Sequence, residues 1–281
     1  LKLFNKILVG IPGITGFLNE NILDITNTSE NKLNLMQFTP GSALTGTTRI
    51  KTLSDDELSS LGNKFLKYGI HGFVNIGGNG TIKQTKAIRN YIGDHINVAA
   101  APKTVDNDLG DSDCSDVLFT PGFPSCVNHW AKIATLLDIE NEGSASHDKA
   151  LVAQTFGRET GFLAGAIRVI DPLRKLPIAI LLPEDQRPIN EVIRYIDKLI
   201  TKHGRAMVYI SEGYNLGVLG TVHDATGQIM YGSSKSTSAQ LLVDELIENN
   251  IQARSYIPTV LQRQAIDDTL SIDRVVAFKQ G

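Results

Sequence analysis

Short apolar runs alternate with longer amphipathic segments along nearly the whole chain. The apolar runs predict strands at residues 6–9, 72–76, 97–101, 150–156, 178–182, 206–211 and 253–259. Apolar residues at helical spacing predict helices at residues 81–92, 124–137, 161–170, 190–202 and 236–249, and another helix starts near Asp273. One further helix is marked by a capping box, Ser54-Asp-Asp-Glu57, which is followed on one predicted face by Leu58, Leu61, Phe65 and Leu66.

Alternation of strands and helices is typical of α/β folds, in which crossovers join parallel strands and ligands bind at the strands' carboxyl ends. The strands are too numerous for one small sheet. We therefore expect an α/β fold of two Rossmann-like lobes with mainly parallel sheets. Residues 1–117 with 262–281 would form one lobe, and residues 118–261 the other. The polar, Asn-rich residues 19–34 carry the weakest structural pattern.

Composition narrows the class of protein. The chain has 281 residues, 42% hydrophobic and 20% charged, which is ordinary for a globular protein. A net charge of -3 gives no excess of basic residues, which argues against nucleic acid and acidic membrane surfaces as partners. No apolar run reaches the roughly 18–20 residues that span a bilayer, and we expect a cytoplasmic protein. The spacing of Cys114 and Cys126 matches neither a disulfide framework nor a zinc site, so both are expected to be small buried side chains.

A glycine-rich segment, Asn75-Ile-Gly-Gly-Asn-Gly-Thr81, joins a predicted strand to a predicted helix. Glycines at such a place let backbone amides approach a phosphate, and the helix N-terminus adds partial positive charge. A tight strand-to-helix turn would need the same residues. The segment alone leaves both interpretations open.

A second segment, Pro102-Lys-Thr-Val-Asp-Asn-Asp108, also follows a predicted strand and therefore opens at the same sheet edge. Its two carboxylates and one amide stand beside a lysine and a threonine. These groups could bind a hydroxylated phosphoester, hold a metal and accept a proton. A surface turn would tolerate this composition but would not require it, so we favour a functional loop.

Seven segments in order resemble the 6-phosphofructokinases over residues 41–277. Pro102-Lys-Thr-Val-Asp-Asn-Asp-Leu109 resembles the catalytic loop, and Gly77-Gly-Asn-Gly-Thr81 resembles the nucleotide loop. The remaining matches are Thr120-Pro-Gly-Phe123, Phe156-Gly-Arg158, Ser211-Glu-Gly213, Leu261-Gln-Arg263 and Asp273-Arg-Val-Val-Ala277. The resemblance implies a glycolytic phosphotransferase that converts fructose 6-phosphate to fructose 1,6-bisphosphate with ATP or pyrophosphate.

The resemblance also implies roles on the sugar side. Asp106 is similar to the general base that takes the proton of the sugar C1 hydroxyl, and Thr104 to a residue that orients the substrate. Arg158 completes the implied catalytic set. The other implied substrate contacts are Lys103, Asp108, Lys149, Gly157, Glu212, Arg254 and Arg263. Some of these cations reach across from a second subunit in the family, which implies a homo-oligomer, a dimer or a tetramer.

On the donor side, the implied contacts are Gly10, Arg49, Gly78, Asn79 and Gly80. Mg²⁺ is the implied cofactor, with Asn79 and Asp108 as its protein ligands. Pyrophosphate enzymes typically have Asp at the position of Gly80, so this glycine argues for ATP. Lys103 resembles the pyrophosphate enzymes and a subset of the ATP enzymes, whereas ATP enzymes often have Gly at this position. Together the two positions favour ATP.

The chain departs from the family pattern at four places. Residues 10–19 are a distorted form of the first phosphate loop, and Asn79 replaces an Asp that helps to hold Mg²⁺. Val260 stands where a His or Tyr commonly faces the sugar. Residues 263–268 replace a run of Arg-Gly-Gly-Ser-Pro.

Two alternatives stay open. The weakened donor loops are compatible with a non-catalytic or regulatory paralogue that binds sugar phosphate, although such a protein has less need of Asp106. Lipid and NAD kinases carry similar glycine-rich loops, but they lack the segment at residues 102–108 and the later arginines. His129, Trp130 and His147 match no functional position, and we interpret them as helix-packing or surface residues.

Overall fold

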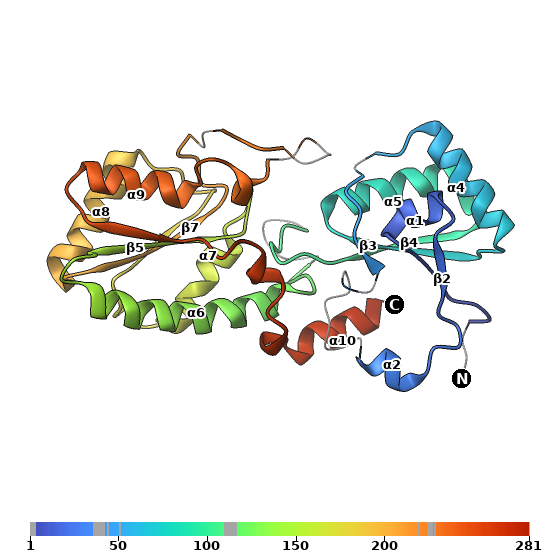
Figure 1. Cartoon of the computed structure of the whole chain (residues 1–281), viewed down its shortest axis with the longest axis horizontal. Coiled ribbons are helices and arrows are strands. Elements are labelled where there is room, and N and C mark those ends of the chain that lie inside the picture. Colours follow the sequence, from blue (N-terminus) through green and yellow to red (C-terminus); the bar gives the residue numbers. More distant parts are fainter. Residues whose placement is uncertain are drawn as a thin grey trace. The chain divides into compact units, whose positions relative to one another are not determined.

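The chain folds into two units, Leu1–Lys103 with Arg274–Gly281 and Thr104–Asp273, each with its own sheets and core (Figure 1). This computed structural model describes residues 4–35, 43, 45–50, 52–109, 117–217, 220–223, 227 and 229–280. The predicted α/β class with mainly parallel sheets is confirmed.

The larger unit is built on a four-stranded parallel sheet in the order β6-β7-β5-β8. These strands are β5 (Ala150–Thr155), β6 (Ile178–Leu181), β7 (Ala206–Ser211) and β8 (Ala253–Tyr256). In the register of β5 with its two neighbours, Ala150 lies opposite both Ala206 and Ala253. All four strands therefore point their carboxyl ends to one edge.

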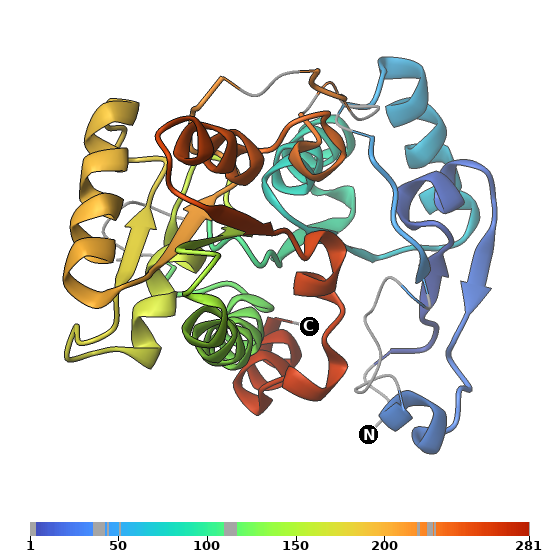
Figure 2. The same ribbon diagram turned by 60° about the vertical axis from the view of Figure 1, so that its left-hand side comes forward.

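Helices cover both faces of this sheet, which makes a three-layer unit (Figures 1 and 2). One face packs against α8 (Ile189–His203) and α9 (Ser238–Glu248), the other against α6 (Phe123–Ser144) and α7 (Phe162–Ala166). Successive strand residues alternate between the two cores: Val152 belongs to the first and Leu151 to the second.

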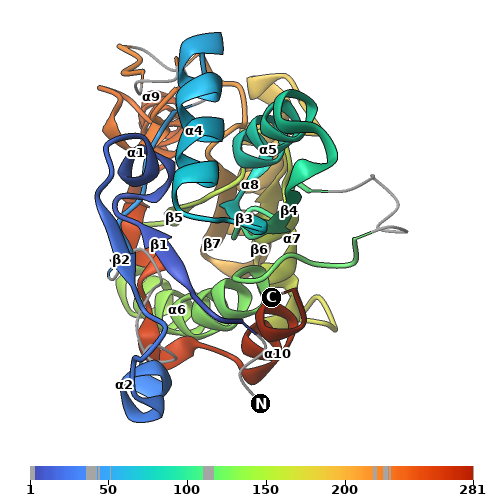
Figure 3. The same cartoon turned by 90° about the vertical axis from the view of Figure 1, so that its right-hand side faces the viewer.

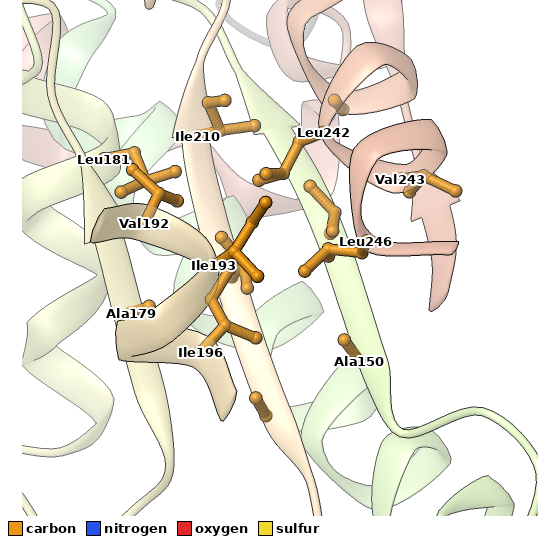
Figure 4. Packing of buried hydrophobic residues seen from close by; sticks show 14 of the residues in the cluster. Ala150, Ala179, Leu181, Val192, Ile193, Ile196, Ile210, Leu242, Val243 and Leu246 are labelled. Atoms are coloured by element: carbon orange, nitrogen blue, oxygen red, sulfur yellow. The ribbon is translucent and has the colours of Figure 1, made fainter. Parts of the chain in front are cut away.

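The core beneath α8 and α9 contains almost only aliphatic side chains (Figure 4). Ile196 of α8 and Leu242 of α9 are fully buried there against Val208 and Ile210 of the central strand β7. Full burial of each such side chain contributes about 1.5–3 kcal/mol. This rigid layer fixes the strand ends that carry the predicted sugar-side residues.

The smaller unit has two strand pairs (Figure 3). β3 (Gly72–Gly77) and β4 (Asn97–Pro102) are parallel, while β1 (Leu8–Gly10) and β2 (Ile22–Asp24) are antiparallel. Its described helices include α1 (Gly13–Leu18), α2 (Glu30–Leu35), α4 (Asp55–Lys67) and α5 (Asn79–Ile92). Phe17, Phe65 and Phe73 form the centre of its core, with ring centroids 4.9–6.2 Å apart.

The predicted capping box is present at the start of α4. Glu57 N donates to Ser54 Oγ at 3.2 Å, and Ser54 N donates to Glu57 Oε2 at 2.9 Å. Leu61 and Phe65 are fully buried, as predicted, but Leu66 is 73% exposed. The prediction for Leu66 was wrong because each helical residue turns by about 100°, which carries Leu66 past the buried face.

Most predicted strands and helices match the observed ones within a few residues. Among the α-helices and β-strands of the described residues, β2, α1 and α2 were missed; they have three, six and six residues. β8 also ends earlier than predicted, because Pro258 leads into the 3₁₀ helix η5 (Thr259–Arg263). The predicted C-terminal helix is α10 (Ser271–Gln280).

α6 carries a buried cysteine. Burial raises the pKa of the Cys126 thiol to about 12, with a further contribution from the Asp106 charge, so this thiol is unreactive near neutral pH. Cys114 lies outside the described residues. Neither α6 nor any other helix in the described part of the chain combines the length and apolar character needed to cross a membrane.

The units divide at different residues from the predicted lobes, after Lys103 rather than after residue 117, and after Asp273 rather than after residue 261. The cause is hydrogen bonding to the larger unit. Thr120 Oγ1 donates to Thr104 O at 2.7 Å, and the carboxylate of Asp273 accepts from Gly122 N and Ser125 N at 2.9 and 2.8 Å. The assignment of donor and sugar roles to the lobes stays a prediction.

Candidate active site

Two loops meet at the carboxyl edge of the larger sheet, after the adjacent strands β5 and β7. The chain leaves β5 toward α7 on one face and leaves β7 toward α9 on the other, which is the arrangement at which parallel α/β sheets usually bind ligands in a crevice outside the strand ends. Glu212 N donates to Thr155 O at 2.9 Å, and Gly213 N donates to Gly157 O at 3.0 Å. The two predicted sugar-side segments therefore lie side by side.

Two glycines make this close approach possible. Gly157 has φ 124°, and a Cβ there would lie 2.2 Å from Thr160 O. A Cβ on Gly213 would lie 1.7 Å from Arg158 O. Both glycines are therefore required by backbone packing, and the sugar contact expected of Gly157 stays a prediction.

Glu212 is the most deeply buried charged group of the crevice, with 6% exposure. Burial, and after it the charge of Asp106, raises the pKa of its carboxyl to about 7, against the opposing charges of Arg158 and Arg263. Arg158 Nε lies 3.8 Å from Glu212 Oε1. These four predicted site residues share one electrostatic environment.

The loop that carries Asp106 is held by hydrogen bonds on both sides. Asp106 N donates to Thr104 Oγ1, and Thr160 Oγ1 donates to Asp106 O, both at 3.2 Å. Asn107 adopts φ 55° and is buried, and its Oδ1 accepts a hydrogen bond from Thr120 N at 2.8 Å. These contacts fix the backbone of the candidate base before any ligand binds.

Gln262 is a supporting residue that sequence reasoning missed. Its Oε1 accepts hydrogen bonds from Phe156 N at 3.0 Å and from Trp130 Nε1 at 2.9 Å. The next residue, Arg263, places its guanidinium 4.3 Å from the centre of the Phe156 ring, a cation–π contact. Gln262 and Asn107 each lie within a segment that resembles the family. A buried amide side chain between expected site residues is the sequence signal that could have identified both as supporting residues.

Two predicted cations lie elsewhere in the same unit. Lys149 precedes β5, and Arg254 stands opposite Leu151 near the start of that strand. Four strand residues, or about 13 Å, separate Leu151 from the carboxyl end of β5. Arg254 pairs instead with Asp148 and lies 3.9 Å from Glu140. Lys149 and Arg254 are therefore not brought to the crevice of their own chain.

The smaller unit presents the predicted nucleotide loop at the N-terminus of α5. Gly78 O accepts hydrogen bonds from Thr81 N at 2.9 Å and Ile82 N at 3.1 Å. A Cβ on Gly77 would lie 2.1 Å from Thr81 Oγ1, whereas a Cβ on Gly80 would meet nothing within 4 Å. Packing thus accounts for Gly77 but not for Gly80.

The loop after β3 is tied to the end of β4, because Lys103 N donates to Gly77 O at 2.9 Å. The Lys103 side chain is exposed, and Asn79 is the first residue of α5. A helix N-terminus of this kind favours phosphate groups.

Gly10 ends β1 and is buried. A Cβ there would lie 2.3 Å from Gly13 O, so packing of the turn into α1 requires this glycine. The side chain of Thr48 lies against Gly13, and the exposed Arg49 is the residue that follows Thr48. The donor contacts expected of Gly10 and Arg49 stay predictions.

A family model described as phosphofructokinase matches residues 5–281. The chain belongs to the phosphofructokinase family. The pyrophosphate–fructose 6-phosphate 1-phosphotransferase of Rhodospirillum rubrum is 29% identical over 226 residues, which are 78% of this chain and 50% of that protein. The ATP-dependent 6-phosphofructokinase of Cytophaga hutchinsonii is 26% identical and covers 74% of this chain and 58% of that protein.

The fold of this phosphofructokinase family member is shared with a solved structure, the pyrophosphate-dependent phosphofructokinase from Nitrosospira multiformis. The TM-score is 0.82 at 24% identity, over 99% of this chain and 66% of that one. The chain thus spans about half to two-thirds of the length of the relatives it matches. The names of these relatives do not confirm the predicted preference for ATP.

Phosphofructokinases generally require a divalent metal, and the two predicted ligands lie in different units, Asn79 in the smaller and Asp108 in the larger. Within the described ranges, no group of three or more His, Cys, Asp or Glu side chains could enclose a metal. Mg²⁺ usually needs only one or two carboxylates together with substrate phosphates. The half-buried Asp108 fits that requirement.

Proposed function

We propose that this protein transfers a phosphoryl group to the C1 hydroxyl of fructose 6-phosphate and so forms fructose 1,6-bisphosphate. The observation that supports this most strongly is the placement of Asp106 on a fixed loop in the same electrostatic environment as Glu212, Arg158 and Arg263. Asp106 takes the C1 proton as the C1 oxygen bonds to phosphorus and the bond from that phosphorus to the bridging oxygen of the donor breaks, which releases ADP from ATP or phosphate from pyrophosphate. Thr104 orients the substrate. The arginines hold phosphate oxygens through paired N–H donors.

The donor we propose is ATP, and this rests on Gly80. Packing gives no reason for a glycine there, since an added Cβ would meet nothing within 4 Å. An Asp at this position would set negative charge against the α-phosphate of a nucleotide, so its absence supports ATP. Lys103 and the names of several relatives support pyrophosphate, which is the alternative donor.

We propose Mg²⁺ as the cofactor; Asp108 of the larger unit would bind it together with phosphate oxygens of the donor. Asn79 is the other ligand that the family resemblance implies. The metal would neutralise charge on the transferring phosphoryl group. Because the Asn79 amide is neutral, the protein's own attraction for the ion is weaker than with an Asp at this place.

We also propose a homo-oligomer, which the position of Lys149 and Arg254 supports. Both lie at the amino ends of the strands, away from the crevice of their own chain. Cations that serve a neighbouring copy would lie outside their own site in this way. Subunit mixing tests this: Asp106→Asn and Arg254→Ala variants are each impaired, but mixed pairs regain one complete site and thus activity. Mixed pairs without activity would contradict shared sites.

A coupled assay with fructose 6-phosphate tests the proposed function, with ATP and pyrophosphate offered separately and Mg²⁺ present. The expected result is turnover that Asp106→Asn removes. A matched control is Asp197→Asn, an exposed residue of α8. Tight binding of fructose 6-phosphate without turnover from either donor would instead favour a non-catalytic paralogue.

A further inference from the structure

The sugar side of the crevice lacks one polar group that the family resemblance leads us to expect. Val260, where a His or Tyr commonly faces the sugar, is apolar and 59% exposed in η5. The residue before it, Thr259, has φ 46°, an uncommon conformation for a β-branched side chain. The side chain at position 260 therefore offers a ligand no hydrogen bond.

A second segment lies against this position. The short 3₁₀ helix η4 (Tyr231–Ser233) precedes α9, and a Cβ on its Gly232 would lie 3.5 Å from Thr259 Cγ2, an ordinary van der Waals distance. Tyr231 directly precedes Gly232, which packs beside the start of η5. The segment that carries Tyr231 is therefore in contact with the start of η5, the helix that contains Val260.

Backbone contacts fix the segment from both ends. Met230 N donates to Val222 O at 2.7 Å, and His223 pairs with Ile229 in an antiparallel bridge. Downstream, Ser238 Oγ donates to Glu212 O at 3.0 Å, which joins the start of α9 to the loop after β7.

The Tyr231 side chain is partly buried and interacts with the charged groups of the crevice. The pKa of its hydroxyl is raised, first by burial and then by the negative charge of Glu212, while Arg158 opposes the shift. The hydroxyl therefore stays protonated at neutral pH and is available as a hydrogen-bond donor near Glu212.

We propose that Tyr231 is a substrate-binding residue that donates a hydrogen bond to the bound sugar phosphate and so takes over the role left open by Val260. This inference rests on the proposed function. It assigns the hydroxyl to an oxygen of a phosphorylated sugar, because the adjacent arginines suit phosphate and Glu212 suits sugar hydroxyls. The hydrogen bond is formed in both ground and transition states, so it acts on affinity rather than on turnover.

The test is Tyr231→Phe, which removes only the hydroxyl, with Tyr195→Phe on α8 as the matched control, since Tyr195 is 40% exposed. Calorimetric titration with fructose 6-phosphate should show a Kd raised by roughly two- to twelvefold for Tyr231→Phe, and KM raised with kcat unchanged. Tyr195→Phe should bind as the wild type does. Wild-type Kd in Tyr231→Phe would overturn the inference while leaving the proposed function intact; a wild type that binds no fructose 6-phosphate would overturn both.

A second variant tests whether Tyr231 and Val260 occupy the same role. Val260→His introduces the family's common residue and should restore affinity in a Tyr231→Phe background while improving the wild type much less. If Val260→His improves both backgrounds by the same factor, the two residues act independently and the substitution of roles is refuted.

Discussion

The carboxamide oxygen of Gln262 accepts a hydrogen bond from the backbone N–H of Phe156 at 3.0 Å, which joins η5 to the end of β5. The same oxygen accepts the indole N–H of Trp130 in α6. Gln262 is 4% exposed, so no water can replace it easily as the partner of these two donors. One side chain thus joins α6, the end of β5 and η5, and Arg263 is the next residue of η5.

We predict that Gln262→Leu destabilises the fold. Leucine preserves the volume but leaves the N–H groups of Phe156 and Trp130 without an acceptor, and each unsatisfied buried donor costs about 1–3 kcal/mol. The free energy of unfolding in urea should therefore fall by a few kcal/mol. Gln264→Leu, at an exposed position two residues away, should change it by less than about 0.5 kcal/mol. Equal effects of the two variants would show that this buried acceptor contributes nothing.

Asp106→Asn should remove phosphoryl transfer and leave binding intact. The amide keeps the size and the backbone hydrogen bonds of the loop but cannot accept the C1 proton, and loss of a positioned base costs about 10²–10⁴-fold in rate. Turnover is measured in the coupled assay and affinity for fructose 6-phosphate by calorimetry. Near-normal turnover in this variant would rule out Asp106 as the base.

Much of the fold could be predicted because its main elements carry strong patterns. β5 and β7 begin with four and five consecutive apolar residues, and the start of α4 is marked by the capping residues Ser54 and Glu57. α1 and β2 could not be predicted, because six and three residues are too few to show a periodicity. The unit boundaries could not be predicted from the sequence either, because they depend on side-chain hydrogen bonds such as the one that Ser125 N donates to the Asp273 carboxylate.

The candidate site was predictable to the extent that strand ends gather motifs. Glu212 and Arg158 follow adjacent strands, and Arg158 Nε lies 3.8 Å from Glu212 Oε1. The order of the strands in the sheet decides which side chains lie close together, and a sequence motif does not give that order. Arg254 and Arg263 were both expected to contact the substrate, yet Arg254 lies on β8 and pairs with Asp148 near the amino end of β5, whereas Arg263 lies on η5.

Arg263→Ala should weaken the binding of fructose 6-phosphate. A charge-assisted contact to phosphate is worth about 1.5–3 kcal/mol, which corresponds to roughly 10- to 150-fold in Kd. The loss should be partial in Arg263→Lys, which keeps the charge but not the planar fork. Calorimetric titration of both variants measures this. Unchanged affinity in Arg263→Ala would contradict the assigned sugar-phosphate pocket.

Glu212 should make stability depend on pH. Because burial raises the pKa of its carboxyl from 4.5 to about 7, the folded protein keeps a proton that the unfolded chain has already released. This contribution is complete below about pH 4.5 and is lost as the pH rises through 7. The unfolding free energy of the wild type should therefore fall, relative to that of Glu212→Gln, by on the order of 3 kcal/mol when the pH is raised from 4.5 to 8.

Urea unfolding of the wild type and of Glu212→Gln at both pH values measures this relative fall. Glu248→Gln, at the exposed end of α9, is the matched control and should follow the wild type at each pH. A constant difference between Glu212→Gln and the wild type at the two pH values would mean that Glu212 does not titrate in this range.

Gly80→Asp tests the proposed donor. The variant should fold, because an added Cβ meets nothing within 4 Å, whereas Gly77→Asp should not, because its Cβ would lie 2.1 Å from Thr81 Oγ1. At an effective dielectric constant of about 20, two like charges about 4 Å apart repel by about 4 kcal/mol, so an Asp beside the α-phosphate should lower kcat/KM for ATP by at least about tenfold. Pyrophosphate has no corresponding third phosphate and should be spared.

Gly80→Ala is the matched control, since it adds the Cβ without the charge and should keep ATP as a donor. The measurement is kcat/KM of each variant with ATP and with pyrophosphate at saturating fructose 6-phosphate. If Gly80→Asp uses ATP as well as Gly80→Ala does, the nucleotide does not lie against the N-terminus of α5. If only pyrophosphate supports turnover in the wild type, the preference for ATP fails, because Gly80 then has neither a packing reason nor a nucleotide to accommodate.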